Sequence, residues 1–302
     1  MKVAVMGSGA VGGYFGGLLA RGGADVAFIA RGRHLEALRA QGLAVKSVKG
    51  DFSLLVRASD DPEEVGPVDL ILFSVKSYDT ERAMRQALPM VGAETVILSL
   101  QNGVDNEEKI ASVAGKGKVL GGVAYIGSSV PEPGVILHEM EGKIAFGELD
   151  GGMSDRVGKL KALFDRCGLP AEASPDIRKA LWAKLAWNAP FNAINALVGG
   201  LVRAIVENPQ TLELARRVTA EVVAVAAASG VSLDLAEVWE RNVRFSRRSD
   251  IKTSMLQDLE TGRPLEHEAL NGIIVKYGVN LGIPTPYSFA LYALLSRLQP
   301  KA

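Results

Sequence analysis

A lysine and three asparagines form the most unusual chemical pattern in this sequence. They occupy positions 184, 188, 192 and 195 of a stretch, 181–195, whose other residues are almost all apolar. At about 100° per residue along an α-helix, the four side chains fall within about 80° of one another and form one stripe. A helix that is apolar on its other faces is expected to be buried, so the stripe is expected to line a wet cleft.

Lys184 is the first candidate for chemistry in this stripe. Burying an ammonium group is unfavourable unless a partner or a ligand uses its charge. Such a group could hydrogen-bond a substrate carbonyl and protonate the alkoxide that forms on reduction. The alternative is a lysine whose ammonium reaches the surface from a domain or dimer interface. Pro190 is expected to bend the helix near Ala186.

Glu266 is the second candidate. If the residues from 264 onward are helical, Glu266 shares a face with Leu270, Ile273, Ile274 and Tyr277, so its carboxylate lies on the apolar side. A carboxylate is also tolerated in the first turn of a helix, and a capping role is therefore the alternative.

The glycine-rich run Gly7-Ser8-Gly9-Ala10-Val11-Gly12 follows the apolar residues 3–6 near the start of the chain. Phosphate groups approach the N–H groups at a helix N-terminus only where no side chain intervenes. Gly7 would permit the tight turn, Gly9 the close approach, and Gly12 the packing of helix on strand. All six residues are predicted to bind a dinucleotide.

The end of the second expected strand, 24–29, favours NADP(H) over NAD(H). An NAD-specific site usually has Asp or Glu there to bond the ribose 2′-hydroxyl, whereas this chain has Arg31 and Arg33. Guanidinium groups bind a 2′-phosphate, and we assign Arg31 to the cofactor. The alternative is that both arginines are solvated loop charges.

Lys76 and Asn102 also follow expected strands, 70–75 and 95–100. Open α/β sheets bind ligands at the carboxyl ends of their strands, so both residues are expected to face the cofactor, and ordinary loop positions are the alternative.

The pattern of elements predicts an α/β protein. Strand-like runs at 3–6, 24–29, 70–75, 95–100 and 118–126 alternate with helical stretches, which is typical of a parallel, doubly wound Rossmann-type sheet. Residues 134–149 read as two short strands around a Glu141-Gly142 turn, pairing antiparallel at the sheet edge. A helix near 154–167 follows, and from 176 the pattern is helical. We expect an NADP-binding domain over 1–172 and an all-α substrate and dimerisation domain over 173–302.

The composition limits the kinds of molecule that this protein is expected to bind. The 302 residues include 34 basic and 34 acidic side chains, so no overall charge favours nucleic acid or an anionic membrane surface. The single cysteine, the lack of a signal sequence and the lack of a membrane span point to a cytoplasmic protein with a small-molecule substrate. The three histidines lack the spacing of metal ligands, so no metal is expected. The apolar runs 218–225 and 291–298 fit either a homodimer interface or the core.

Several of these segments, in this order, resemble the ketopantoate reductase (2-dehydropantoate 2-reductase) family. The similar segments are Gly7-Ser8-Gly9-Ala10-Val11-Gly12, Val75-Lys76, Gln101-Asn102-Gly103, Trp182-Ala183-Lys184-Leu185-Ala186-Trp187-Asn188, Ser254-Met255-Leu256-Gln257-Asp258 and Glu266 ahead of Leu270-Asn271-Gly272.

The resemblance implies an NADPH-dependent reduction of a 2-oxo acid, with ketopantoate giving (R)-pantoate on the route to pantothenate and coenzyme A. It implies that Lys184 is the general acid and that Glu266 binds the substrate hydroxyl or orients Lys184. The substrate-binding residues would be Asn102, Lys184, Asn188, Asn192 and Ser254, and Asn102 would also contact the nicotinamide.

Two segments depart from the family pattern and keep alternatives open. His267-Glu268-Ala269 stands where the family usually has Ile-Asp-Tyr, and Ile251-Lys252-Thr253 replaces a segment that often contains Asn and Ser. The alternatives are a related NADP-dependent reductase of another small 2-oxo acid and a non-catalytic NADP(H)-binding sensor.

Overall fold

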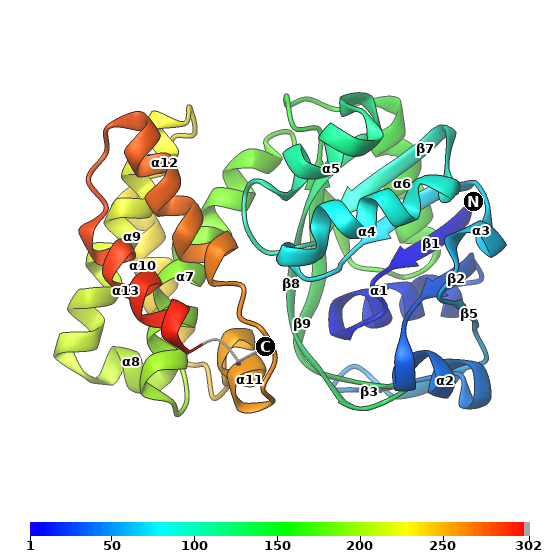
Figure 1. Ribbon diagram of the computed structural model, residues 1–302, viewed down its shortest axis with the longest axis horizontal. Coiled ribbons are helices and arrows are strands. Elements are labelled where there is room, and N and C mark those ends of the chain that lie inside the picture. The colour runs from blue at the N-terminus through cyan, green and yellow to red at the C-terminus, as the bar shows by residue number, and fades with distance from the viewer. Residues whose placement is uncertain (299–302) are drawn as a thin grey trace. The chain divides into compact units, whose positions relative to one another are not determined.

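The computed structural model describes residues 1–298, which form two compact units (Figure 1). The first unit comprises Met1–Gln101 and Asn106–Ile177, and the second comprises Asn102–Asp105 and the chain from Arg178 onward. The sequence suggested a boundary at 172/173, whereas the division lies at 177/178 and assigns a four-residue loop of the first half to the second unit. Within residues 1–298, no helix is long and apolar enough to cross a membrane.

The first unit is built on one ten-stranded sheet in the order β4-β3-β9-β8-β7-β6-β1-β2-β5, with β10 paired to β9 outside this path. Across the sheet, the neighbouring strands β5, β2, β1, β6, β7 and β8 pair in parallel. Strand β8 pairs antiparallel with β9, and β3 pairs antiparallel with β4. The strands are β1 (Lys2–Met6), β2 (Asp25–Ile29), β3 (Leu43–Ser47), β4 (Phe52–Leu54), β5 (Arg57–Ser59), β6 (Val68–Phe73), β7 (Val91–Ser99), β8 (Val119–Glu132), β9 (Val135–Gly147) and β10 (Ala171–Ala173).

Helices cover both faces of this sheet, which confirms the doubly wound Rossmann-type fold. Alternate residues of β1 point to opposite faces: Val3 and Val5 belong to one apolar cluster, and Ala4 and Met6 to another. Residues of α1, α2 and α6 complete the first cluster, and residues of α3, α4 and α5 complete the second. The helices are α1 (Ala10–Arg21), α2 (Gly32–Gln41), α3 (Pro62–Val65), α4 (Thr80–Ala87), α5 (Asn106–Ala114) and α6 (Asp155–Arg166), with 3₁₀ turns at Ser77–Asp79, Leu88–Met90 and Lys116–Lys118.

The turn predicted at Glu141-Gly142 is wrong. Strand β9 continues through these residues, and its register against β8 shifts there because Glu141 (φ 63°) and Gly142 (φ 84°) form an irregularity within the strand. The reversal lies earlier, at Pro133-Gly134, where proline fixes its own φ and Gly134 adopts a φ of 81°. Because β3 and β4 extend the sheet beyond it, β9 also does not form the edge.

Four short strands were not expected from the sequence: β3, β4, β5 and β10. Three of them have only three residues, too few to show an alternating pattern. Each is stabilised by pairing with a longer strand or with a neighbour that a longer strand supports, as β10 pairs with residues 144–146 of β9.

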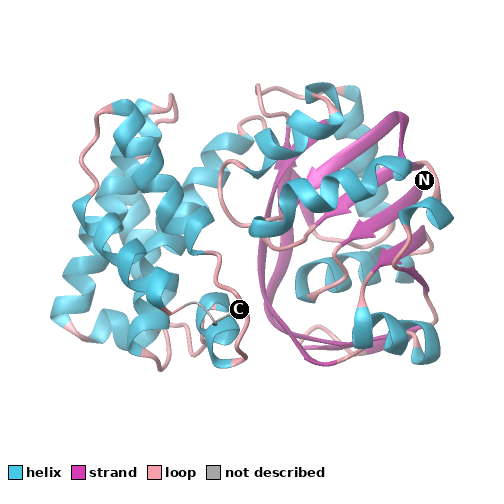
Figure 2. Ribbon diagram, viewed as in Figure 1, coloured by secondary structure: helices cyan, strands magenta, loops and turns pink. Residues whose placement is uncertain are grey.

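The second unit is helical, as expected (Figure 2). Its helices begin and end at residues typical of helix termini: α7 ends before Gly199, Asn208 caps α9 through its side-chain oxygen, and α13 begins at Pro286. The helices are α7 (Ile177–Val198), α8 (Arg203–Glu207), α9 (Pro209–Ala228), α10 (Leu235–Arg247), α11 (Ser254–Glu260), α12 (Ile273–Leu281) and α13 (Pro286–Arg297), with a π-helical turn at Glu268–Gly272.

Each of the two apolar runs that fitted either an interface or the core contributes one face to the core of this unit, while Leu294 of the second run is 56% exposed. Val218, Val222 and Val225 of α9 and Leu295 of α13 are fully buried, and Leu291 of α13 is almost so. Residues spaced three or four apart share one face of a helix, so each run buries the face that these residues define.

A buried carboxylate joins α9 to α13. Glu221 accepts hydrogen bonds from the N–H groups of Tyr287 and Ser288 at 2.8 and 2.7 Å, and from the Ser288 hydroxyl at 2.6 Å. These N–H groups lie in the first turn of α13 and have no partner within the helix, so Glu221 caps α13 from outside.

Replacing this carboxylate should destabilise the second unit. We expect Glu221→Ala to lower the free energy of unfolding by about 2 kcal/mol, because buried donors lose a charged acceptor. Denaturant titration of the wild type and the variant measures the change. Glu213→Ala, at an exposed ion pair of the same helix, is the matched control and should leave stability almost unchanged. Equal stability of Glu221→Ala and the wild type would contradict the assigned role.

Candidate functional site

The stripe on α7 divides into two parts. Lys184 is half-buried and Asn188 is buried, and they lie in the N-terminal two-thirds of the helix. Asn192 accepts hydrogen bonds from the Ser254 hydroxyl and the Met255 N–H, both at 3.3 Å. The stripe thus includes residues near Lys184 and residues that hold the start of α11.

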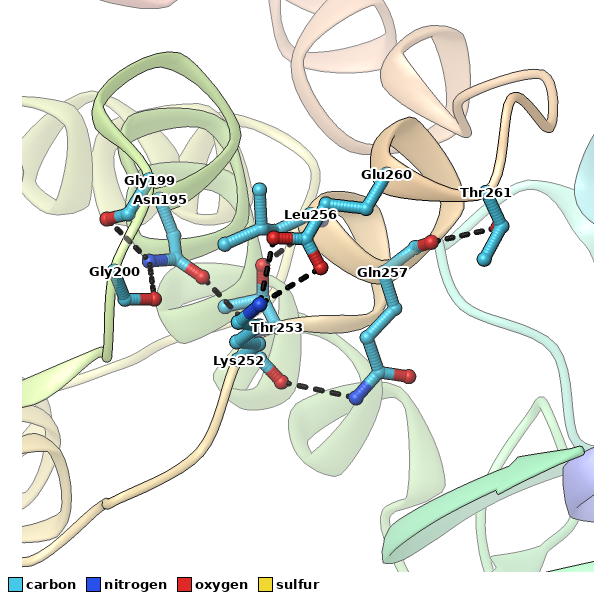
Figure 3. A network of polar contacts seen from close by, with 9 residues as sticks. All are labelled: Asn195, Gly199, Gly200, Lys252, Thr253, Leu256, Gln257, Glu260 and Thr261. Carbon is cyan, nitrogen blue, oxygen red and sulfur yellow. Dashed lines mark hydrogen bonds and ion pairs between the residues drawn. The ribbon is translucent and has the colours of Figure 1, made fainter. Parts of the chain in front are cut away.

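Asn195 belongs to the second part and does not line a wet cleft, because its side chain is fully buried. Its amide donates to the carbonyls of Gly199 and Gly200 at 3.3 and 3.2 Å and accepts from the Thr253 N–H at 2.9 Å (Figure 3). Asn195 therefore joins the end of α7 to the residue before Ser254, a role that periodicity alone does not distinguish from ligand binding.

The chain just before and within α11 has further local support. Lys252 forms an ion pair with Glu260 at 2.6 Å, and Gln257 donates to the Lys252 carbonyl at 3.3 Å (Figure 3). Ser254 itself remains exposed, with its hydroxyl directed to Asn192. These contacts hold the Ser254 hydroxyl of α11 against Asn192 of α7.

Lys184 has the chemical property expected of a proton donor near neutral pH. Burial lowers the pKa of its ammonium group to about 8, and the opposite charge of Glu266 partly counteracts this effect. The group is thus mostly protonated at neutral pH yet loses its proton much more readily than an exposed lysine.

Glu266 is buried and connects to Asn188 through Asn102. The Asn102 side-chain amide donates to Glu266 Oε2 at 3.4 Å, and its carbonyl oxygen accepts from the Asn188 amide at 3.3 Å. The loop containing Asn102 groups with the second unit, so all these contacts lie within one unit. Lys184, Asn188, Asn102 and Glu266 form what we call the lysine cluster.

The helical argument for Glu266 needs one correction. Glu266 precedes a π-helical turn, Glu268–Gly272, so the 3.6-residue spacing that placed it with Ile273 and Tyr277 does not hold across that turn. The residue is nevertheless buried, because the chain before the turn directs it toward Asn102.

Gln101 supports the start of the Asn102 loop, and sequence reasoning did not single it out as a support. Its side-chain amide donates to the Val75 carbonyl at 3.0 Å and to the Thr80 hydroxyl at 2.8 Å. These bonds join the connection after β7 to the connection after β6, which contains Lys76. A glutamine directly between an apolar strand and Asn-Gly was the signal available in the sequence.

In the first unit, the predicted cofactor residues follow the carboxyl ends of neighbouring parallel strands. The glycine-rich turn follows β1, Arg31 follows β2, and Lys76 follows β6 by a few residues. Arg31 is exposed, with Nη2 3.5 Å from a carboxylate oxygen of Asp79, which also pairs with Arg82.

The geometry of the glycine-rich turn fits the approach of a phosphate group. Gly7 has a φ of 95°, and a side chain at Gly12 would lie 2.3 Å from the Gly7 carbonyl oxygen and from Ser74 Oγ. At Gly9, by contrast, a Cβ atom would meet nothing within 4 Å. Helix α1 begins just after Gly9 without a side-chain cap, so its first N–H groups have no partner from a cap.

Two side chains hold this turn from outside. Ser8 donates from both its N–H and its hydroxyl to the Ile29 carbonyl, at 3.2 and 2.9 Å. His34 Nδ1 accepts from the Gly134 N–H at 3.1 Å, so Nε2 is the protonated nitrogen and donates to the Ser8 carbonyl at 2.8 Å. Burial lowers the pKa of His34, which favours this neutral form. Ser8 thus has a structural role in addition to the cofactor contact predicted for it.

Two family profiles match this chain, one in each half. The profile of a family described as "Ketopantoate reductase PanE/ApbA" matches residues 3–151, and the profile of its C-terminal part matches residues 176–299.

Individual proteins are similar over nearly the whole length. A 2-dehydropantoate 2-reductase of Mesorhizobium japonicum is 35% identical, over 99% of this chain and 98% of the relative. A 2-dehydropantoate 2-reductase of Archaeoglobus fulgidus is 38% identical, over 93% of this chain and 92% of the relative. The crystal structure of 2-dehydropantoate 2-reductase from Geobacter metallireducens superposes with a TM-score of 0.91 at 37% identity, covering 98% of this chain and 99% of that one.

Two glycine substitutions should separate binding from folding in the glycine-rich turn. We expect Gly9→Ala to keep the wild-type free energy of unfolding but to weaken dinucleotide binding by about 10-fold or more, since its methyl group enters only the space expected for phosphate. Gly12→Ala should instead destabilise the first unit by about 1–3 kcal/mol, because its methyl group meets backbone. Fluorescence titration and thermal unfolding measure the two effects, and unchanged affinity in Gly9→Ala would refute the assignment.

Proposed function

This chain belongs to the ketopantoate reductase PanE/ApbA family, and from that premise we propose that it reduces 2-dehydropantoate to (R)-pantoate with NADPH. The observation that carries the mechanism is the half-buried Lys184 ammonium, with a pKa of about 8, beside Glu266. The product would serve pantothenate and coenzyme A biosynthesis.

The proposed reaction needs a proton as well as a hydride. The hydride that the keto carbon accepts would come from NADPH when it is bound. Lys184 Nζ hydrogen-bonds the keto oxygen, stabilises the negative charge that develops there, and transfers its proton to give the hydroxyl group. Lys184 is left as a neutral amine and is reprotonated from solvent.

The other residues of the lysine cluster and Ser254 would orient the substrate. Glu266 keeps the ammonium protonated by its charge and accepts a hydrogen bond from the substrate hydroxyl. Asn102 and Asn188 present amide groups beside it, and the Ser254 hydroxyl, fixed on Asn192, provides a further polar contact. Amide and hydroxyl groups both donate and accept, which suits a substrate with hydroxyl and carboxylate groups.

The preference for NADPH is supported by charge at the end of β2. Arg31 and Arg33 are exposed there, and residues 30–35, which follow the strand, include no acidic side chain. Lys76 and the glycine-rich turn from Gly7 to Gly12 would bind the rest of the dinucleotide. Asp79 already holds Arg31, so the phosphate would share this guanidinium with a carboxylate.

One of the two segments that depart from the family pattern, His267-Glu268-Ala269, contacts α13. The His267 ring stacks on Tyr292 with ring centres 5.5 Å apart, and Glu268 accepts a hydrogen bond from the Tyr292 hydroxyl at 2.7 Å. The His267 and Glu268 side chains are therefore engaged with Tyr292 rather than with Asn102 or Asn188. This supports ketopantoate as substrate over another small 2-oxo acid.

A panel of 2-oxo acids tests this proposal. We expect oxidation of NADPH, followed by absorbance, to be fastest with 2-dehydropantoate and slower with NADH as cofactor. Lys184→Ala should lower kcat by about 10²-fold to 10⁴-fold while retaining NADPH affinity, because it removes only the proton donor. Preference for another 2-oxo acid would favour a related reductase, and binding of NADPH without turnover of any acid would favour a sensor. Normal turnover by Lys184→Ala would exclude this lysine as the acid.

The pH dependence of the reduction provides a separate test of the acid. Since the protonated lysine is the active form, kcat/KM should be constant at neutral pH and fall as the pH rises through about 8. Glu266→Gln removes the charge that raises the pKa of Lys184, so the fall should begin at lower pH. Glu268→Gln, which removes an exposed carboxylate two residues away, should leave the midpoint in place. A midpoint that is the same in wild type and Glu266→Gln would contradict the proposed pairing.

A further inference from the structure

The helix that carries Lys184 has a gap in its hydrogen bonding. Pro190 lies inside α7 and has no N–H group, so the carbonyl of Ala186 lacks the donor that residue i+4 normally provides. Ala186 is fully buried, and water cannot replace the missing donor. An unpaired buried carbonyl is costly, so the fold must supply a donor from another element.

Asn242 of α10 is that donor. Its side-chain amide donates to the Ala186 oxygen at 2.9 Å, and the residue is 1% exposed. The Thr219 hydroxyl lies 3.3 Å from the same oxygen, but it lies only 2.9 Å from the Ala215 carbonyl. A hydroxyl has one hydrogen to donate, and the shorter contact takes it, so Asn242 is the main partner of Ala186.

A neighbouring residue extends this contact along α7. Arg241 donates from Nη2 to the Ala183 carbonyl at 2.9 Å and to the side-chain oxygen of Asn242 at 3.3 Å. Helix α10 thereby holds the two carbonyls that bracket Lys184 in the sequence. The backbone of α7 is held from a second helix at the turn that carries the proposed acid.

We propose that Asn242 is a positioning residue for the reduction. Its bond to the Ala186 carbonyl holds the turn between Lys184 and Asn188 in the conformation that keeps both side chains beside Glu266 and Asn102. A leucine has a similar branched shape but no group that can donate, so it would leave the carbonyl unpaired. This inference rests on the proposed function, because it assigns the residue to the positioning of the lysine cluster.

A double-mutant cycle with Pro190 tests the inference. In Pro190→Ala, residue 190 regains an N–H that can bond Ala186 within the helix, so Asn242 becomes dispensable to that carbonyl. We expect Asn242→Leu to lower kcat by about 10-fold to 100-fold in the wild-type background and much less in the Pro190→Ala background. NADPH affinity should remain within about two-fold of the parent protein, because the glycine-rich turn belongs to the other unit.

A stability control separates positioning from folding. Glu221→Ala weakens the same helical unit at a contact that does not involve α7, and its kcat should stay near the wild-type value. Loss of kcat in Asn242→Leu that merely follows the folded fraction would overturn the inference. An equal effect of Asn242→Leu in both backgrounds would also overturn it, because the residue would then act by a route other than the Ala186 carbonyl.

A readout that needs no turnover keeps this test independent of the proposed reaction. Competitive labelling of lysines with acetic anhydride across pH, followed by mass spectrometry, measures the titration midpoint of Lys184. The midpoint should move away from its wild-type value in Asn242→Leu and return toward that of Pro190→Ala in the double variant. Failure of the wild type to reduce 2-dehydropantoate would refute the proposed function alone, whereas an unmoved midpoint in Asn242→Leu would refute the positioning role.

Discussion

The burial of one ammonium group sets the main constraint on the helical unit. Helix α7 contributes most of its faces to the core of that unit, so Lys184 is held where water reaches it poorly. Burial alone favours the neutral amine, and the nearby Glu266 carboxylate favours the ammonium. The balance leaves a pKa of about 8, which suits the proton donor that we propose Lys184 to be. Asn102 and Asn188 satisfy polar atoms around this pair without adding charge.

The same helix must satisfy its own backbone while it carries these side chains. Pro190 removes one donor, and Asn242 supplies another from α10. Farther along α7, Asn192 and Asn195 bond to the backbone before and within the start of α11. The buried polar residues of this unit therefore divide into two groups: some are those that we propose to contact a ligand, and others keep the elements that carry them in place.

The glycine-rich turn of the first unit is likewise held in place by a few hydrogen bonds. The Ser8 hydroxyl and N–H bond to the end of β2, and His34 connects the Ser8 carbonyl to the Pro133-Gly134 turn. These bonds use polar groups on the protein side of the turn, while the open space at Gly9 and the uncapped start of α1 lie where phosphate is expected. Neighbouring strands supply Arg31 and Lys76 at the same edge of the sheet.

Periodicity and turn chemistry in the sequence were sufficient to predict the doubly wound sheet and the helical second half, because long apolar runs and glycine-rich turns are local signals. They also identified Lys184 and Glu266 as polar residues on apolar elements. The family came from a resemblance carried by several motifs in one order. The sequence could not reveal that β9 runs through Glu141-Gly142, since a strand irregularity and a hairpin turn favour the same residues. It could not assign Asn195 to the backbone of residue 253 or Asn242 to the carbonyl of Ala186. Those roles depend on which distant backbone group lies within hydrogen-bonding reach of each side chain, and only the packing of one helix against another decides that.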